Sequence, residues 1–354
     1  MLKKNAMKES NTIISSDFTT ELNQLLTKWQ GNKIFILTDD QTKKFCLPAV
    51  LLCDKTKDSH IITLEHGDNH KNIESAVKIW SYLSENGATR KSLMINLGGG
   101  MITDIGGFTA STFKRGISYI NLPTTLLGAV DAATGGKTGI NFLGFKNEIG
   151  VFSPAETVLI NVDFFRTLDA KNFRSGFAEM VKHTLIDSRK AWNEILKFDF
   201  EKNDFEILQE LLRYNIAIKQ RIVTEDPREQ GIRKALNLGH TFGHAFETLS
   251  YKSGQPLLHG YAIAFGMICE LYLSYIKLGF PKEDFLKYKY FVHEIYGSFN
   301  CDCKNYDAIV ELMTHDKKNE SDEINFTLLS DVGDIKINQT ATKAEIFECL
   351  DILF

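Results

Sequence analysis

The chain has 354 residues, of which 43% are hydrophobic and 24% are charged, and its formal net charge is −4. This composition is typical of a globular protein long enough for two domains, and it excludes a general attraction to nucleic acid. A bound anion would therefore need a local cluster of basic side chains. No run of eighteen apolar residues and no apolar signal core are present, so we expect no membrane partner and a cytoplasmic protein.

Six cysteines are scattered at positions 46, 53, 269, 301, 303 and 349. The only close pair is Cys301 and Cys303, and no second pair completes the spacing of a zinc ribbon. We therefore expect reduced thiols, as is usual in the cytosol.

In the first part of the chain, residues 1–168, short apolar stretches alternate with stretches in which apolar residues recur at helical spacing. Strands are predicted at 33–40, 60–65, 92–97, 117–122 and 157–162, and a helix at 71–86. Strand, turn and helix repeated in this way favour a parallel sheet with covered faces. We predict an α/β, Rossmann-like nucleotide-binding domain over 1–168.

The segment LGGGMITDIGGF, residues 97–108, follows a predicted strand and opens a predicted helix. Its glycines would let the backbone approach a pyrophosphate at the helix N-terminus. It is out of register with GxGxxG, so a tight turn with close helix–sheet packing is a second interpretation. Asp39 ends the first strand, where an acid can bind a ribose diol, although an aspartate there is also typical of a helix cap.

A second glycine-rich segment, residues 123–150, contains Asp131, Lys137, Lys146 and Asn147. Its GGKT string resembles the end of a Walker A loop, but the glycine that such a loop needs at its start is Asp131. A nucleoside-triphosphatase is therefore disfavoured. Two lysines and an asparagine on glycine-rich backbone indicate a cradle for phosphate or carboxylate.

Residues 169–354 are predicted to form a mainly α-helical domain. Helices are expected at about 175–187, 205–224, 232–251, 259–278, 283–297 and 304–315. A hairpin near 324–339 and a short helix close the chain.

Three of these helical segments carry possible metal ligands, namely Glu179, His240 and His259. Two histidines and one carboxylate are the ligand set of open catalytic zinc sites. Each residue alone has a plainer interpretation, since a buried histidine is usually just hydrogen-bonded and a helical glutamate is usually solvated. Asn237, His240, His244 and Glu247 are expected to share one face of the helix predicted at 232–251.

Eight motifs occur together and in order: GGGMITDIGGF, FKRG, PTTLLGAVDAATGGKTGIN, KNEIG, SGFAEMVKH, GIRKALNLGHTFGHAFE, LHGYAIAFGM and HDKKN. Through them the chain resembles the 3-dehydroquinate synthases, within the sugar phosphate cyclase superfamily, over roughly residues 30–335. The resemblance implies an NAD- and metal-dependent carbon–oxygen lyase of the shikimate pathway and aromatic amino acid biosynthesis. The reaction implied converts 3-deoxy-D-arabino-heptulosonate 7-phosphate to 3-dehydroquinate and phosphate by transient oxidation, phosphate elimination, re-reduction and intramolecular aldol closure.

The resemblance also implies zinc or cobalt as the metal, a homodimer, and a role for each matching residue. The metal ligands would be Glu179, His240 and His259. The NAD site would comprise Asp39, Asp68, Lys71, Gly99, Gly100, Asp104, Thr124, Thr125, Lys137, Lys146 and the segment from Phe164 to Thr167. The catalytic and substrate-contacting residues would be Asp131, Lys137, Lys182, Lys219, Arg233, Asn237 and His244. Asn147, Arg115 and Lys318 would also bind substrate, with Arg115 reaching the phosphate from a neighbouring subunit.

Two positions depart from the family pattern. Asp68 stands where glutamate is usual, and Tyr261 stands where the HGEAV motif has an acid, two residues after the implied ligand His259. Three other functions remain open from the sequence: a sister cyclase acting on glucose 6-phosphate or sedoheptulose 7-phosphate, a polyol dehydrogenase of the glycerol dehydrogenase type, and a zinc-stabilised binding module.

Overall fold

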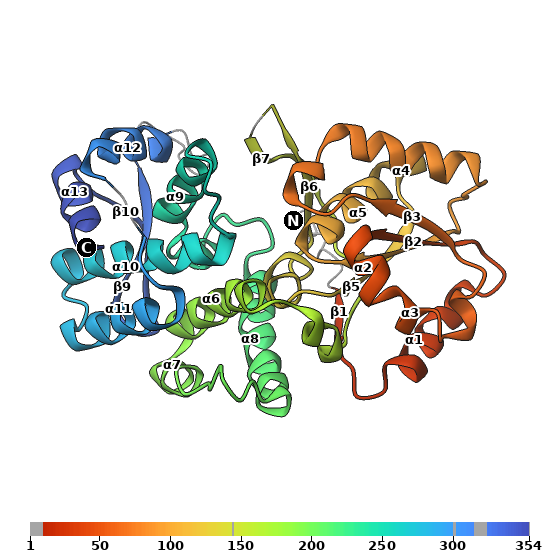
Figure 1. Cartoon of the computed structure of the whole chain (residues 1–354), viewed down its shortest axis with the longest axis horizontal. Coiled ribbons are helices and arrows are strands. Elements are labelled where there is room, and N and C mark those ends of the chain that lie inside the picture. Colours follow the sequence, from red (N-terminus) through yellow and green to blue (C-terminus); the bar gives the residue numbers. More distant parts are fainter. Residues whose placement is uncertain (1–9, 144, 300–301, 315–323, 354) are drawn as a thin grey trace, which may run out of the picture. The chain divides into compact units, whose positions relative to one another are not determined.

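The computed structural model describes residues 10–143, 145–299, 302–314 and 324–353. The chain folds as two units, Met1–Asp169 and Ala170–Phe354 (Figure 1). Unit 1 is built around a parallel sheet and unit 2 around a helical core.

Unit 1 contains a six-stranded sheet in which every strand pair is parallel. The strand order is β1-β8-β5-β4-β2-β3. β2 and β4 are buried along their whole length, as expected for a sheet that is covered on both faces. This confirms the predicted α/β class. The strands are β1 (Asn11–Ile14), β2 (Ile34–Asp39), β3 (His60–Leu64), β4 (Leu93–Gly98), β5 (Ser118–Pro123) and β8 (Thr157–Ile160).

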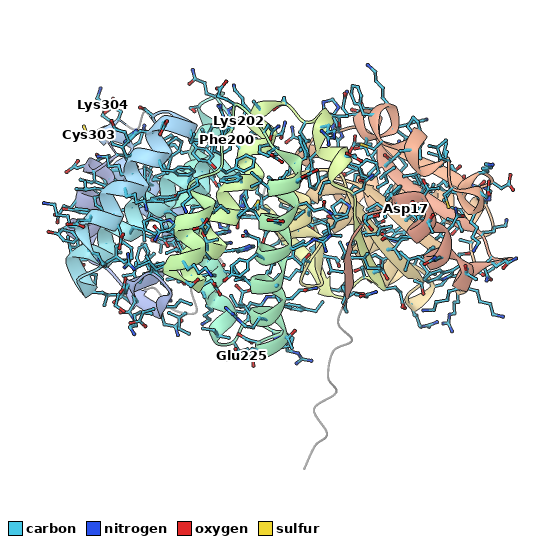
Figure 2. All side chains as sticks on the ribbon, turned by 90° about the horizontal axis from the view of Figure 1, so that it is seen from below. Asp17, Phe200, Lys202, Glu225, Cys303 and Lys304 are labelled. Carbon is cyan, nitrogen blue, oxygen red and sulfur yellow. The ribbon has the colours of Figure 1, made fainter. Side chains whose placement is uncertain are left out.

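Three of the five α-helices described in unit 1 begin after a side chain that accepts a hydrogen bond from a backbone amide. Asp17 accepts from the amide of Thr20 (3.3 Å), and Asn72 accepts from that of Ser75 (2.9 Å); Figure 2 labels Asp17. Figure 1 shows α4 on one side of β2 and β3, with α1 and α3 on the other. The helices are α1 (Phe18–Leu26), α2 (Asp40–Phe45), α3 (Leu47–Val50), α4 (Ile73–Glu85) and α5 (Gly100–Thr112). Short turns of helix are η1 (Thr27–Trp29), η2 (Asp54–Thr56), η3 (Asp68–His70), η4 (Phe113–Arg115), the π-helix η5 (Gly128–Ala132) and η6 (Val162–Thr167).

The second glycine-rich segment forms an antiparallel hairpin that the sequence did not predict. It consists of β6 (Lys137–Phe142) and β7 (Phe145–Phe152). Gly139 pairs with Gly150, and a Cβ on Gly139 would lie 2.7 Å from the carbonyl oxygen of Ile149. Glycine is normally depleted in strands. A strand that needs glycine for close backbone approach is therefore not predicted from its sequence.

Unit 2 is mainly helical and is built around α10 (His259–Leu278), which contacts α6, α9, α11, α13 and β9. Figure 2 labels Glu225, where α8 ends. The other elements are α6 (Ala170–Asp187), α7 (Arg189–Ile195), α8 (Phe205–Glu225), η7 (Ile232–Asn237), α9 (His240–Lys252), α11 (Lys282–Tyr296), η8 (Cys303–Asn305), α12 (Tyr306–Thr314), β9 (Asn325–Asp331), β10 (Asp334–Thr340) and α13 (Lys343–Asp351).

Helix α10 is also the one candidate membrane span found among the described residues, by its length and apolar composition. Within its most apolar window, 67% is buried inside the protein. A buried helix at the centre of a bundle has the same composition as a span because it is hydrophobic all round.

The prediction of one continuous helix over 232–251 is wrong. This segment is divided into the 3₁₀ turn η7 and the helix α9, with Gly239 between them in the left-handed region (φ 80°). Because a left-handed residue breaks the helical repeat, the expected common face of Asn237 with His240 does not follow from helical spacing. His240 is instead the first residue of α9.

Candidate functional site

In unit 1, residues implied for NAD follow the carboxyl ends of neighbouring parallel strands. Asp39 ends β2, Gly99 follows β4, and Thr124 follows β5. These ends lie at one edge of the sheet because the strands are parallel. β2 lies between β3 and β4. The chain therefore places β3 on one side of β2 and the later strands β4 and β5 on the other side, so the strand order reverses at β2. Such a switch point is where open α/β sheets bind nucleotides.

The N-terminus of α5 lies at this edge. Gly99 is its N-cap residue, and a Cβ on Gly99 would come within 3.0 Å of Cγ2 of Thr125. A tight approach to the turn after β5 therefore favours glycine at this position. The helix N-terminus also supplies a partial positive charge and amide donors, which suit a pyrophosphate.

Asp39 is engaged as a helix cap. Its carboxylate accepts hydrogen bonds from the amide (2.7 Å) and the hydroxyl (3.0 Å) of Thr42 in α2. The structure thus confirms Asp39 as a helix cap. Binding of a ribose by Asp39 stays a prediction.

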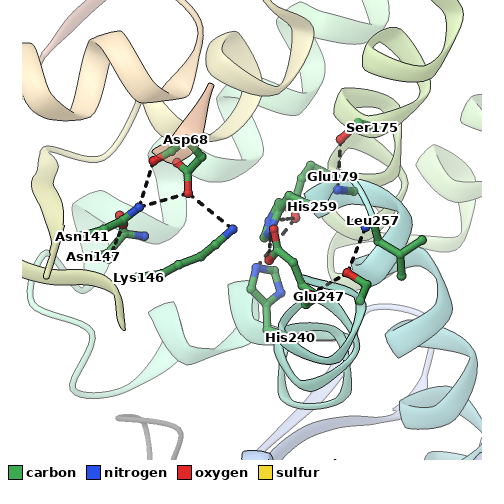
Figure 3. Close-up of polar contacts among 12 residues, drawn as sticks. Asp68, Asn141, Lys146, Asn147, Ser175, Glu179, His240, Glu247, Leu257 and His259 are labelled. Atoms are coloured by element: carbon green, nitrogen blue, oxygen red, sulfur yellow. Dashed lines mark hydrogen bonds and ion pairs between the residues drawn. The ribbon is translucent and has the colours of Figure 1, made fainter. Parts of the chain in front are cut away.

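Lys71 is the centre of a polar network in unit 1. Its Nζ lies 3.0 Å from Oδ2 of Asp104 and 2.6 Å from Oδ1 of Asn147. Burial lowers the pKa of Lys71, but Asp104 and Asp68 outweigh burial and raise that pKa above its ordinary value. Lys71 is therefore a fixed positive charge among residues implied for cofactor and substrate. Lys146 joins the network at 3.5 Å from Oδ2 of Asp68 (Figure 3).

Asn141, which the sequence did not single out, ties this network together. Its Nδ2 donates to Oδ2 of Asp68 (3.1 Å), and its Oδ1 accepts from the amide of Asn147 (3.0 Å). Asn147 has a left-handed backbone (φ 51°), which is uncommon for a residue other than glycine. Nothing in the sequence indicated this role, because an asparagine in a glycine-rich segment is ordinary.

Other implied residues of unit 1 lie on short turns and at strand starts. Asp131 lies in η5, and exposed Lys137 begins β6. Exposed Arg115 ends η4 with a left-handed backbone (φ 67°). The ring of Phe164 in η6 is buried edge-on against Phe18, with centroids 5.2 Å apart.

In unit 2, the structure brings Glu179, His240 and His259 together from α6, α9 and α10 (Figure 3). Oε1 of Glu179 lies 3.7 Å from Nε2 of His240 and 3.5 Å from Nε2 of His259. One ligand atom of each residue lies within 4.8 Å of the other two. Glu179 is fully buried, so its charge needs close compensation.

This donor set fits a zinc-sized cation. Tetrahedral ligands at roughly 2.0–2.2 Å from zinc lie about 3.3–3.6 Å from one another. The two glutamate–histidine distances are close to that range. Nδ1 of His240 donates to the carbonyl of Leu238 (3.2 Å), and Nδ1 of His259 donates to Glu247 (3.4 Å), so both Nε2 atoms are left to face a metal.

Lys182 and His244 flank the three donors. Lys182 is buried, forms an ion pair with Glu179 and donates to the carbonyl of Leu236 (2.7 Å). The ring centroid of His244 lies 5.2 Å from that of His240 and 6.1 Å from that of His259. Both implied substrate residues therefore lie next to the candidate metal ligands.

The remaining implied residues of unit 2 are held by nearby elements. Lys219 is buried in α8, and Arg233 in η7 donates to the carbonyl of Pro227 (2.7 Å). Asn237 donates to Oε1 of Glu229 (2.8 Å), a contact that the sequence did not predict. Lys318 lies outside the described residues.

We expect the metal-free protein to lose stability as the pH rises from about 6.5 to about 9. Burial lowers the pKa of His259, but hydrogen bonds to Glu179 and Glu247 outweigh it and raise that pKa from 6.5 to about 9. A group with a raised pKa stabilises the fold fully below its unfolded pKa, and this contribution is lost as the pH passes the folded pKa. Urea unfolding at several pH values measures the effect, and a free energy of unfolding that rises through this window would contradict it.

Known proteins match this chain over most of its length. A family model described as 3-dehydroquinate synthase N-terminal matches residues 61–175, and one described as 3-dehydroquinate synthase C-terminal matches residues 176–319. A protein of Parabacteroides distasonis named 3-dehydroquinate synthase is 51% identical over 345 residues, which is 98% of each chain.

Two solved structures share the fold. A 2-deoxy-scyllo-inosose synthase complexed with carbaglucose-6-phosphate, NAD⁺ and Co²⁺ has a TM-score of 0.85 at 22% identity and covers 99% of this chain and 98% of its own. A 2-epi-5-epi-valiolone synthase from Streptomyces hygroscopicus with NAD⁺ and Zn²⁺ bound has a TM-score of 0.83 at 22% identity and covers 98% of each chain.

Proposed function

Because the chain belongs to the 3-dehydroquinate synthase family, we propose that it converts 3-deoxy-D-arabino-heptulosonate 7-phosphate to 3-dehydroquinate and phosphate. The family resemblance of the eight motifs is confirmed by the two family models and by the relative at 51% identity. The observation that carries the proposal is the convergence of Glu179, His240 and His259, whose ligand atoms lie within 4.8 Å of one another.

We propose that the carboxyl edge of the unit 1 sheet binds NAD. The glycines at the start of α5 and the threonines after β5 lie at this edge, with the helix N-terminus available for the pyrophosphate. Lys71 and Asp104 form a partly buried ion pair that holds their side chains in place (3.0 Å). A bound NAD would accept a hydride from the substrate carbon that bears the hydroxyl being oxidised, and would later return it to the same carbon.

We propose that the donors of unit 2 bind a divalent cation, zinc or cobalt. Such a cation would stabilise negative charge on neighbouring hydroxyl oxygens of the substrate. Lys182, which is buried beside Glu179, would hold an anionic group of the substrate by a charge-assisted hydrogen bond. His244, whose ring lies next to both metal histidines, would hold or transfer a proton at the substrate.

The other substrate contacts are proposals of the same kind. The basic residues would hold the sugar phosphate, which carries a carboxylate and a phosphate, in one conformer. Positioning of the substrate would then supply much of the rate enhancement. In unit 1 these contacts are Arg115, Asp131, Lys137 and Asn147, and in unit 2 they are Lys219, Arg233, Asn237 and Lys318.

Phosphate release with three sugar phosphates tests the function. We expect release only with 3-deoxy-D-arabino-heptulosonate 7-phosphate, with catalytic amounts of NAD and without accumulation of NADH. Release with glucose 6-phosphate or sedoheptulose 7-phosphate instead would identify a sister cyclase. Net formation of NADH would favour a polyol dehydrogenase, and unfolding of unit 2 on chelation without any turnover would favour a zinc-stabilised binding module.

We further propose that the protein is a cytoplasmic homodimer. The β6–β7 hairpin exposes five large apolar residues, an arrangement that is typical of an interaction surface. They are Phe142, Leu143, Phe145, Ile149 and Phe152, and Leu143 is 81% exposed. The five cysteines among the described residues are all free, as is usual for a cytosolic protein.

Leu143→Asp is expected to weaken the dimer by at least about tenfold, since burying a leucine contributes more than roughly 1.4 kcal/mol. Sedimentation velocity over a concentration series measures the dissociation constant. Leu52→Asp is the matched control, because Leu52 is also exposed in unit 1 (69%) but lies outside the hairpin. Equal dissociation constants for the two variants would exclude the hairpin as the interface.

A further inference from the structure

Two of the three candidate ligands stand at the first position of a helix whose own N-cap residue provides no side-chain cap. His240 begins α9 after Gly239, and His259 begins α10 after Leu258. Six other helices among the described residues, by contrast, begin after an aspartate, asparagine, serine or threonine that accepts a backbone hydrogen bond. The first amides of α9 and α10 therefore need partners from elsewhere.

Glu270 supplies the cap of α9 from a different helix. Its carboxylate accepts hydrogen bonds from the amides of Gly239 (2.6 Å) and Thr241 (3.0 Å), the two residues that flank His240. Glu270 is fully buried in α10, about three turns after His259. In the low dielectric of the interior, such charge-assisted bonds are strong and hold the start of α9 in one position.

Close backbone packing leaves the start of α9 little room to move against α10. A Cβ on Gly239 would lie 2.4 Å from Cγ of Met267, and one on Gly266 would lie 2.1 Å from the carbonyl oxygen of Gly239. Helix α10 thus carries one candidate ligand, His259, and also sets the position of another, His240.

Ser175 makes the corresponding contact between α6 and α10. Its hydroxyl accepts a hydrogen bond from the amide of Gly260 (3.0 Å), the residue next to His259 (Figure 3). Ser175 lies one turn before Glu179 on the same helix. A Cβ on Gly260 would lie only 1.8 Å from the carbonyl oxygen of Ser175, so these two helices also meet backbone to backbone.

We propose that Ser175 and Glu270 are positioning residues that link the three ligand-bearing helices in the order α6, α10, α9 and hold their donors at metal-binding distance. The charge of Glu270 also offsets the positive end of the α9 dipole, which would otherwise repel a cation held by His240. This inference deepens the proposed function, because it rests on metal binding by Glu179, His240 and His259.

The test measures cobalt binding by the full chain rather than turnover. Affinity for Co²⁺ is obtained by competition with a chelator, and the visible absorption of bound Co²⁺ reports ligand geometry. We expect Glu270→Ala and Ser175→Ala each to weaken Co²⁺ binding by ~10–100-fold, the usual effect of removing a group that orients a ligand. Glu270→Gln, which keeps the shape and one acceptor oxygen, should bind Co²⁺ more tightly than Glu270→Ala.

Thr342→Ala is the matched control, since Thr342 caps α13 in the same unit by accepting from the amide of Glu345 (3.3 Å). It should lower the thermal midpoint while leaving Co²⁺ affinity and absorption unchanged. If Glu270→Ala does not fold, Glu270→Gln and Ser175→Ala decide the matter. Wild-type affinity and absorption in both of those variants overturn the inference, whereas failure of the unchanged protein to bind Co²⁺ overturns the proposed metal function as well.

Discussion

His259→Ala is expected to abolish metal-dependent phosphate release and to leave NAD binding largely in place. The substitution removes one of the three candidate ligands. The distances from Oε1 of Glu179 to Nε2 of His240 and to Nε2 of His259 suit tetrahedral coordination of a cation. Loss of several kcal/mol of charge stabilisation corresponds to a fall in kcat/KM of more than ~10³-fold, at about 1.4 kcal/mol per factor of ten. NAD binding should persist because all residues proposed to contact it lie in unit 1, outside the helical unit that carries His259.

Three measurements on the same preparation separate the effects: metal content, phosphate release and the dissociation constant for NAD. His293→Ala is the matched control, because His293 lies in α11 of the same unit and is not among the candidate ligands. It should retain metal and activity. Activity of the His259 variant in a preparation shown to contain no metal would remove the basis of the assignment.

Lys182→Met is expected to destabilise the metal-free protein strongly and to weaken substrate binding. Lys182 and Glu179 form an ion pair with exposed fractions of 1% and 0%. Removing one partner of a buried pair leaves an uncompensated charge and typically costs about 3–5 kcal/mol of unfolding free energy. If Lys182 also contacts substrate, a further ~1.5–3 kcal/mol of binding free energy should be lost, which appears in KM and kcat.

Added zinc distinguishes the two roles of Lys182. A cation bound to Glu179 compensates the carboxylate that the variant leaves buried, so zinc should stabilise Lys182→Met more than it stabilises the unchanged protein. Lys277→Met is the control, since the Lys277–Glu345 pair (2.9 Å) is partly exposed and should contribute at most about 1 kcal/mol. Unchanged unfolding, KM and kcat in Lys182→Met would contradict both roles.

Local sequence patterns were enough to predict most elements of both units. Buried runs such as SLMINL predicted β4, and apolar residues at helical spacing predicted α4 and α8, because each pattern reflects one element and its buried face. The pattern failed at Gly239. There the 3.6-residue period continues through a left-handed residue, so a single helix was predicted where the chain has η7 and α9.

The candidate ligands could be predicted from the sequence as residue types, and the family motifs assigned them roles that remain to be measured. Their convergence is a property of the fold, because Glu179, His240 and His259 come from three helices. Asn141 and Ser175 lie within the family motifs but received no role from the sequence, and Glu270 was not singled out at all. Each is an ordinary polar residue whose contacts join segments distant in the sequence.

The sequence by itself thus determined the α/β and helical units, the family, and the identity of the candidate donors, because these follow from local periodicity and from motifs. The tertiary structure alone decided which side chains accept hydrogen bonds from the backbone amides next to these donors, and so what holds the donors in position. A hydrogen bond such as that from Gly239 to Glu270 depends on two helices meeting at a distance set by glycines, and no local pattern encodes that distance.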